Sequence, residues 1–309
     1  MIAPCQTPLP LKSGDLLHVI APSGKLSDRT ALDRGIEIWR ERGFRVEIAP
    51  EIDASWGYLA GTDATRRDRL AAAWADPECR GILCARGGYG GMRLLEDWQW
   101  ATKIEPKWLI GFSDITALLW SLAQQGIAGI HGPLLTTLSD EPDWSRDRLF
   151  DLVAGKPIPT LQGDGWVGNV AHGKLLPCNL TVATHLLGTK LQPDLTGTIL
   201  AIEDVTEAPY RIDRLLTHWR LTGALSQVVG IAIGRFSQCE PPAGSSSFTV
   251  EEVLRDRLTD LQIPIVANLP FGHDGCNAAL PVGGSAILDG NTGTLSIAST
   301  PIIHYPPST

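Results

Sequence analysis

A chain of 309 residues is roughly twice the ~150-residue length of an average domain, so we expect two domains. Its formal charge of −8 argues against nucleic acid or an anionic membrane as a partner, because such binders need basic patches. No run approaches the ~20 apolar residues of a membrane helix, and the N-terminus shows no secretion signal, so we expect a cytoplasmic protein. The six cysteines form no CxxC pair, which predicts reduced thiols and no metal site.

In the first half, short apolar runs alternate with segments of helical spacing. We predict strands at 16–20, 44–49, 81–85, 107–112 and 126–130. The segments between them predict helices at 28–42, 62–75, 92–98 and 114–125. Strands regularly separated by helices indicate a parallel sheet with helices on both faces, which is an α/β domain.

The pattern weakens between residues 138 and 168, where Asp, Pro, Gly and Trp are frequent. We therefore predict an N-terminal domain over 1–150 and a C-terminal domain over 165–309. The second domain is richer in predicted strands, which lie at 198–202, 228–233, 265–269, 286–288 and 294–297. Its predicted helices are 180–187, 210–221 and 250–261.

Ser113 directly follows a predicted strand and opens a predicted helix. Ligands bind beyond the carboxyl ends of parallel strands, and the N–H groups of a helix start can stabilise an oxyanion. The sequence around Ser113 is similar to a nucleophile elbow, although Ile115 stands where the second glycine of G-x-S-x-G would be. The alternative is that Ser113 only caps the helix.

A serine nucleophile needs a base, and two histidines follow predicted strands. His273 lies in a glycine-flanked loop after the strand 265–269. His131 follows the strand that comes next after Ser113 and is a competing base. An ordinary loop histidine is the alternative for His273.

Glu203 and Asp204 emerge together from an apolar strand, so only one of them can face the same side as the site. Either acid could orient the base, or both could cap a turn. With Ser113 in one half and His273 in the other, the site is expected at the domain interface.

A glycine-rich loop at 86–91 follows the strand beside the one that carries Ser113. It matches neither a Walker loop nor G-x-G-x-x-G, so it is a weak phosphate site. We expect it to lend a backbone N–H to an oxyanion hole, with Arg86 and Tyr89 in contact with substrate.

These segments resemble the LD-carboxypeptidase family, the serine muramoyltetrapeptide carboxypeptidases, which also contains microcin self-immunity peptidases. The matching blocks occur in order over nearly the whole chain: RGGYGGMRLL (86–95), GFSDITAL (111–118), HGP (131–133), IEDVTEAPYRIDR (202–214), FGHDG (271–275) and LPVG (280–283).

The resemblance implies a triad of Ser113 as nucleophile, His273 as base and then acid, and Glu203 as the residue that orients the imidazole. It implies an oxyanion hole made by the N–H groups of Gly88 and Asp114. The expected reaction releases D-alanine from cytoplasmic murein tetrapeptides during cell-wall recycling, without metal or cofactor, in a homodimer. The expected fold is a flavodoxin-like N-terminal domain followed by a β-rich α/β domain.

Two departures from the family pattern bear on substrate detail. Pro177-Cys178 precedes Asn179 where the family often has two glycines, which affects the pocket wall that Asn179 is expected to provide. Asp274 follows His273 where a glycine is frequent, which would stiffen the histidine loop.

Two other functions stay open. A self-immunity peptidase would cleave an amide to a nucleotide-like group and would need an aromatic or basic recognition loop. The regions around Trp144 and Trp166 and the serine-rich segment 244–247 are candidates for that loop. A ligand-binding protein that has lost turnover is the third possibility, against which the intact Ser113, Glu203 and His273 argue.

Overall fold

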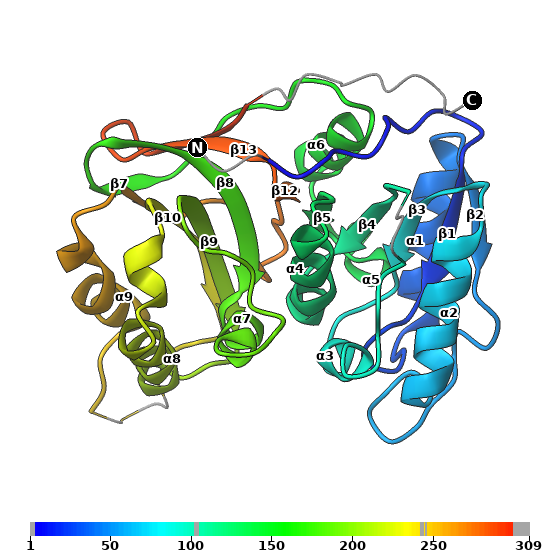
Figure 1. The fold of residues 1–309 in the computed structure, drawn as a ribbon, viewed down its shortest axis with the longest axis horizontal. Coiled ribbons are helices and arrows are strands. Elements are labelled where there is room, and N and C mark those ends of the chain that lie inside the picture. Colours follow the sequence, from blue (N-terminus) through cyan, green and yellow to red (C-terminus); the bar gives the residue numbers. More distant parts are fainter. Residues whose placement is uncertain (1–3, 102–104, 242–243, 245, 299–309) are drawn as a thin grey trace.

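The computed structural model describes residues 4–101, 105–241, 244 and 246–298. In these residues the strands form two sheets, which lie side by side with helix α4 (Thr116–Gln124) between them (Figure 1). The first sheet has the strand order β12-β5-β4-β3-β1-β2. The second has the order β6-β14-β13-β8-β9-β10-β11-β7. The expected mixed α/β architecture is confirmed.

The first sheet is built from the strands that the apolar runs predict. They are β1 (Leu16–Ile20), β2 (Arg45–Ile48), β3 (Cys79–Cys84), β4 (Trp108–Gly111) and β5 (Gly129–His131), all mutually parallel. Their order, 2-1-3-4-5, is that of flavodoxin-like sheets, as expected. An antiparallel strand from the far end of the chain, β12 (Leu280–Val282), pairs with β5 and completes this sheet. Nothing in the sequence pattern indicates that crossing.

Helices cover both faces of the first sheet, and each face has its own apolar core. One core joins α1 (Arg29–Glu41), α5 (Leu135–Leu138) and α6 (Asp143–Val153) to the sheet. The other joins α2 (Asp63–Ala75), α3 (Gly91–Leu94) and α4, and it continues into the second half of the chain. Helix α6 lies within residues 138–168, where the sequence pattern is weak and predicts no helix.

The second sheet has a parallel centre and antiparallel edges. Its parallel strands are β8 (Val170–Asn179), β9 (Thr198–Val205), β10 (Gly230–Ser237) and β11 (Ile265–Ala267). Its antiparallel strands are β6 (Leu161–Gln162), β7 (Asp164–Val167), β13 (Ser285–Asp289) and β14 (Thr294–Ile297). Helices α7 (Leu180–Leu186), α8 (Pro209–Leu221) and α9 (Val250–Leu258) share the core that continues from α4.

The two halves are joined by a buried hydrogen bond as well as by this common core. The indole Nε1 of Trp120, in α4, donates to the carbonyl of Pro177, in β8, over 3.0 Å. Both groups are shielded from water, where an unpaired polar group would be costly. The halves are therefore packed as one body at the level of α4. No helix in the described part of the chain is long and apolar enough to span a membrane.

Candidate active site

Ser113 sits in a strained turn at the carboxyl end of β4. It is the first residue of a 3₁₀ turn (Ser113–Ile115) that leads directly into α4, and its φ is +63°. This left-handed conformation costs a non-glycine residue of the order of 1–3 kcal/mol, and such residues cluster at functional sites. The N-cap residues here are Phe112 and Ile115, and neither makes a side-chain cap. Ser113 therefore has the strained backbone that a nucleophile elbow would require, and it is not the N-cap of either helix.

The glycine-rich loop between β3 and α3 lies against this turn. A Cβ atom on Gly87 would stand 3.0 Å from the Cβ of Ser113 and 3.1 Å from its Oγ. Only a residue without a side chain allows that approach without displacing Ser113. Gly88 follows with φ at +103°, another conformation that favours glycine.

The carboxylate of Asp114 ties the loop to the turn. Its Oδ2 accepts hydrogen bonds from the Ser23 hydroxyl, at 2.5 Å, and from the Gly91 N–H, at 2.6 Å. Asp114 is 3% exposed, and burial raises the pKa of its carboxyl group, although these hydrogen bonds lower it. The tether brings Gly88 and Asp114, the expected oxyanion-hole residues, to the wall of the same pocket as Ser113.

His273 and Glu203 are in direct contact, although they come from different parts of the second half of the chain. Nδ1 of His273, in the loop after β11, is 2.6 Å from Oε2 of Glu203, in β9. Glu203 has no exposed surface. A buried carboxylate on Nδ1 fixes the orientation of the ring and leaves Nε2 as the atom that can take or give a proton.

The pair changes the titration of both groups. Burial raises the pKa of Glu203, against the opposing effect of its hydrogen bond to His273. Burial alone would lower the pKa of His273, but the hydrogen bond and negative charge of Glu203 outweigh it and raise that pKa above the ordinary 6.5. The carboxylate thus makes the imidazole a stronger base.

Glu203 and Asp204 contact different parts of the structure. Asp204 accepts hydrogen bonds from Asn179 Nδ2, from the N–H and hydroxyl of Thr181, and from the N–H of Val205. It anchors the start of α7, while Glu203 holds the histidine. The sequence leaves open which of the two acids faces the base, and the structure answers that question.

Phe112 places the turn of Ser113 beside the histidine. Its ring centroid lies 4.5 Å from that of His273 and 5.7 Å from that of His131. His131, the competing base, is fully buried, and neither ring nitrogen has a hydrogen-bond partner within the described residues. Burial lowers the pKa of His131 to about 3. It lines neither of the two pockets described next.

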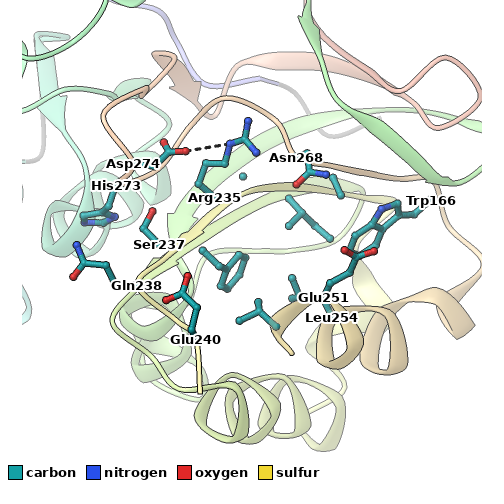
Figure 2. Close-up of a pocket in the computed structure, with 15 residues that line it drawn as sticks. Trp166, Arg235, Ser237, Gln238, Glu240, Glu251, Leu254, Asn268, His273 and Asp274 are labelled. Carbon is teal, nitrogen blue, oxygen red and sulfur yellow. Dashed lines mark ion pairs between the residues drawn. The ribbon is translucent and has the colours of Figure 1, made fainter. Parts of the chain in front are cut away.

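Two pockets are lined by the proposed catalytic groups, one by Ser113 and the other by His273. The Ser113 pocket, about 550 Å³, is lined by Gly88, Ser113 and Asp114 together with residues of α7 and the end of β9. The Arg235 pocket, about 500 Å³, is lined by His273 and Asp274 at one end and by Trp166 at the other (Figure 2). Ser113 and His273 share no hydrogen bond within the described residues.

The three expected substrate contacts lie in different surroundings. Tyr89 lines the Ser113 pocket and is half exposed. Asn179 also lines it, but its side chain caps α7 through Val182 and holds Asp204. Arg86 lines neither pocket of the described structure; its Nη1 donates to the carbonyl of Lys25, at 2.7 Å.

The candidate recognition loops occupy separate places. Trp166 is in β7 and lines the Arg235 pocket, whereas Trp144 is in the first turn of α6. Residue 245 of the serine-rich segment lies outside the described residues. The described part of the chain holds no group of three or more His, Cys, Asp or Glu side chains placed to bind a metal ion.

Comparison with known proteins shows the family. The model of the LD-carboxypeptidase N-terminal domain matches residues 17–132, and that of the C-terminal domain matches residues 172–288. The chain belongs to the LD-carboxypeptidase family. It is 60% identical to a Synechocystis protein named as a presumed carboxypeptidase, over 94% of this chain and 96% of the other. It is 32% identical to the murein tetrapeptide carboxypeptidase of Pseudomonas aeruginosa, over 88% of this chain and 92% of the other.

Solved structures of the family share the two-part fold. The muramoyltetrapeptide carboxypeptidase of Oxalobacter formigenes superposes with a TM-score of 0.81 at 28% identity, covering 91% of this chain and 97% of the other. The self-immunity protein MccF, in complex with glutamyl sulfamoyl guanosine, gives a TM-score of 0.83 at 22% identity, covering 95% and 98%. At that identity the second likeness shows the fold alone.

Proposed function

We propose that this family member is a serine carboxypeptidase that releases the terminal D-alanine of murein tetrapeptides by hydrolysing an L,D-peptide bond. The supporting observation is the 2.6 Å contact between His273 and the buried Glu203, beside the strained turn of Ser113. The names of the Pseudomonas and Oxalobacter relatives support the murein peptide as substrate. A role in cell-wall recycling in the cytoplasm belongs to the same proposal.

In this mechanism Ser113 Oγ attacks the carbonyl carbon of the scissile bond while its proton passes to Nε2 of His273. The N–H groups of Gly88 and Asp114 receive the negative charge that forms on the carbonyl oxygen. His273 then gives its proton to the departing amine, the C–N bond breaks, and an ester to Ser113 remains. Water attacks that ester, again losing a proton to His273, which returns it to Ser113 Oγ.

Glu203 supports both proton transfers because it stabilises the imidazolium that forms twice per cycle. The missing hydrogen bond between Ser113 and His273 is compatible with this scheme. Catalytic contacts are often long in the free enzyme and tighten when substrate is bound.

Incubation with a purified tetrapeptide, with products identified by mass, tests the proposal. We expect D-alanine and a tripeptide, and a loss of at least about 10⁴-fold in kcat for Ser113→Ala. Activity should survive EDTA, because no step uses a metal. A phosphonylating reagent should label Ser113. An unlabelled Ser113 in a protein that still binds the tetrapeptide would instead indicate a binding protein without turnover.

A further inference from the structure

The proposed mechanism gives no role to the Arg235 pocket, although the proposed catalytic histidine, His273, lines it. His273 lines this pocket and does not line the Ser113 pocket. The two pockets therefore offer separate places for the two parts of a substrate that the reaction divides.

The chemistry assigns the parts. The acyl portion becomes an ester of Ser113, so it must lie in the pocket that Ser113 lines. The leaving amine receives its proton from His273, so it must depart on the histidine's side. In a carboxypeptidase the carboxylate of the leaving residue stands only one Cα beyond that amine. A group that recognises it must therefore lie close to His273.

Arg235 meets this condition. Its backbone N–H donates to the carbonyl of Phe271 over 2.8 Å, and its backbone carbonyl would stand 3.0 Å from a Cβ on Gly272. Its Nε lies 3.3 Å from Oδ2 of Asp274, the residue that follows His273. Figure 2 draws this ion pair beside the imidazole. Arg235 thus adjoins the histidine loop on both sides of His273.

Arg235 is also the only arginine or lysine among the described residues that line this pocket. Its side chain is 38% exposed, and its shortest contact to Asp274 is the ion pair from Nε at 3.3 Å, which lacks hydrogen-bond geometry. A guanidinium whose nearest carboxylate lies beside Nε can still offer its Nη donors to a second carboxylate. Of the other acids in the pocket, Glu251 is paired with Arg255 at 2.8 Å. Glu240 also lines the pocket, and its negative charge would repel an anion. The attraction for a carboxylate must therefore come from the guanidinium of Arg235.

We propose that the Arg235 pocket receives the leaving D-residue and that Arg235 binds its terminal carboxylate, with Asp274 holding the guanidinium in place. This rests on the proposed function and deepens it, because it explains why the enzyme would remove a terminal residue and would not cut within a chain. The unusual Asp274 then serves carboxylate recognition by way of Arg235.

A matched pair of substrates tests the inference: a tetrapeptide that ends in D-alanine and the same peptide ending in D-alanine amide. The wild-type protein should prefer the acid by about 10²-fold in kcat/KM, since a charged hydrogen-bonded pair is lost with the amide. Arg235→Gln should lose about the same factor on the acid, mainly through KM, and keep its rate on the amide within about threefold. Arg45→Gln, which changes an exposed arginine of the first domain that is paired with Glu78, should keep the preference.

The outcomes separate the two claims. A wild-type protein that hydrolyses neither peptide overturns the proposed function and this inference with it. A wild-type protein that hydrolyses both peptides equally, or an Arg235→Gln variant that keeps the preference for the acid, overturns the inference alone. An Arg235→Gln variant that loses both activities to the same extent also overturns the inference alone, because that result indicates a structural role.

Discussion

The ring of Phe112 packs on the imidazole of His273, with centroids 4.5 Å apart, and so links the residue before the proposed nucleophile to the proposed base. Phe112 is 3% exposed. Phe112→Ala should lower the free energy of unfolding by about 3–5 kcal/mol, the usual cost of emptying a buried phenylalanine site. It should also lower kcat, because the imidazole loses the surface that positions it. Denaturant unfolding and steady-state kinetics measure the two effects.

Phe112→Leu separates the loss of stability from the fall in kcat. It fills most of the space, so we expect a stability loss of about 1 kcal/mol and a smaller fall in kcat. Full activity in the alanine variant would contradict the positioning role of Phe112.

The pH dependence of kcat/KM should report the Glu203–His273 pair. Only the neutral imidazole can accept the proton of Ser113, so activity rises as pH passes the pKa of His273 upwards. Since that pKa is raised above 6.5, the midpoint of the acid limb should lie above pH 6.5. Glu203→Gln removes the charge that raises it and leaves the burial that lowers it, so the limb should move to lower pH.

The same variant should lose about 10⁴-fold in kcat, because the imidazolium is no longer stabilised or held in the right tautomer. A pH profile with an unmoved acid limb would show that the limb belongs to another group.

Asp114→Ala should damage catalysis although the substitution keeps the backbone N–H of residue 114. The carboxylate that joins Ser23 and Gly91 would be gone, and the glycine-rich loop would lose its fixed distance to the turn. We expect a fall of about 10²–10³-fold in kcat with little change in KM, comparable to the loss of one oxyanion-hole donor. Kinetics with the tetrapeptide check this, and a change confined to KM would argue against it.

Gly87→Ala should lower kcat because the added methyl group crowds Ser113. The added methyl group would lie 3.0 Å from the Cβ of Ser113, so the nucleophile must shift, and a displacement of this kind costs about 10²-fold in rate. Gly223→Ala is the control. It has φ of +75° and no neighbour within 4 Å, so it should cost stability and leave kcat unchanged. Equal kinetic losses in both variants would mean that lost stability, and not crowding, explains the result.

The sequence predicts the five parallel strands of the first sheet well, because each is a short apolar run bounded by turn residues, but it does not predict β12. β1 coincides with the predicted 16–20, and the other four overlap their predicted ranges. The long strand β8 escapes prediction. Pro177 and Gly173 interrupt its apolar pattern, and Pro177 is tolerated because β13 pairs only with residues 170–174. Tertiary pairing, which local pattern does not contain, allows this strand.

For the site, the sequence nominates candidate residues but does not contain their contacts. Position after a predicted strand nominates Ser113, with His273 and His131 as candidate bases and Glu203 and Asp204 as candidate acids. The resemblance to the family then selects His273 and Glu203 and assigns their roles. Arg86 is a candidate because of its place in the glycine-rich loop, yet its guanidinium turns to Lys25. Arg235 lies inside an apolar strand and carries no signal, because its relation to the histidine loop exists only once β10 and β11 are neighbours.

The chain leaves the first sheet after α6, builds most of the second sheet, returns to the first sheet for β12 and ends in the second sheet with β13 and β14. Residues 1–150 expressed alone would expose the hydrogen-bonding edge of β5 that Leu280–Val282 normally covers. Such an open edge invites association with other chains, so this fragment should be prone to aggregation. Three separate stretches of backbone connect the halves: α6 to β6, β11 to β12, and β12 to β13. An opening movement between the halves must bend all three at once, which favours a stiff cleft over one that opens freely.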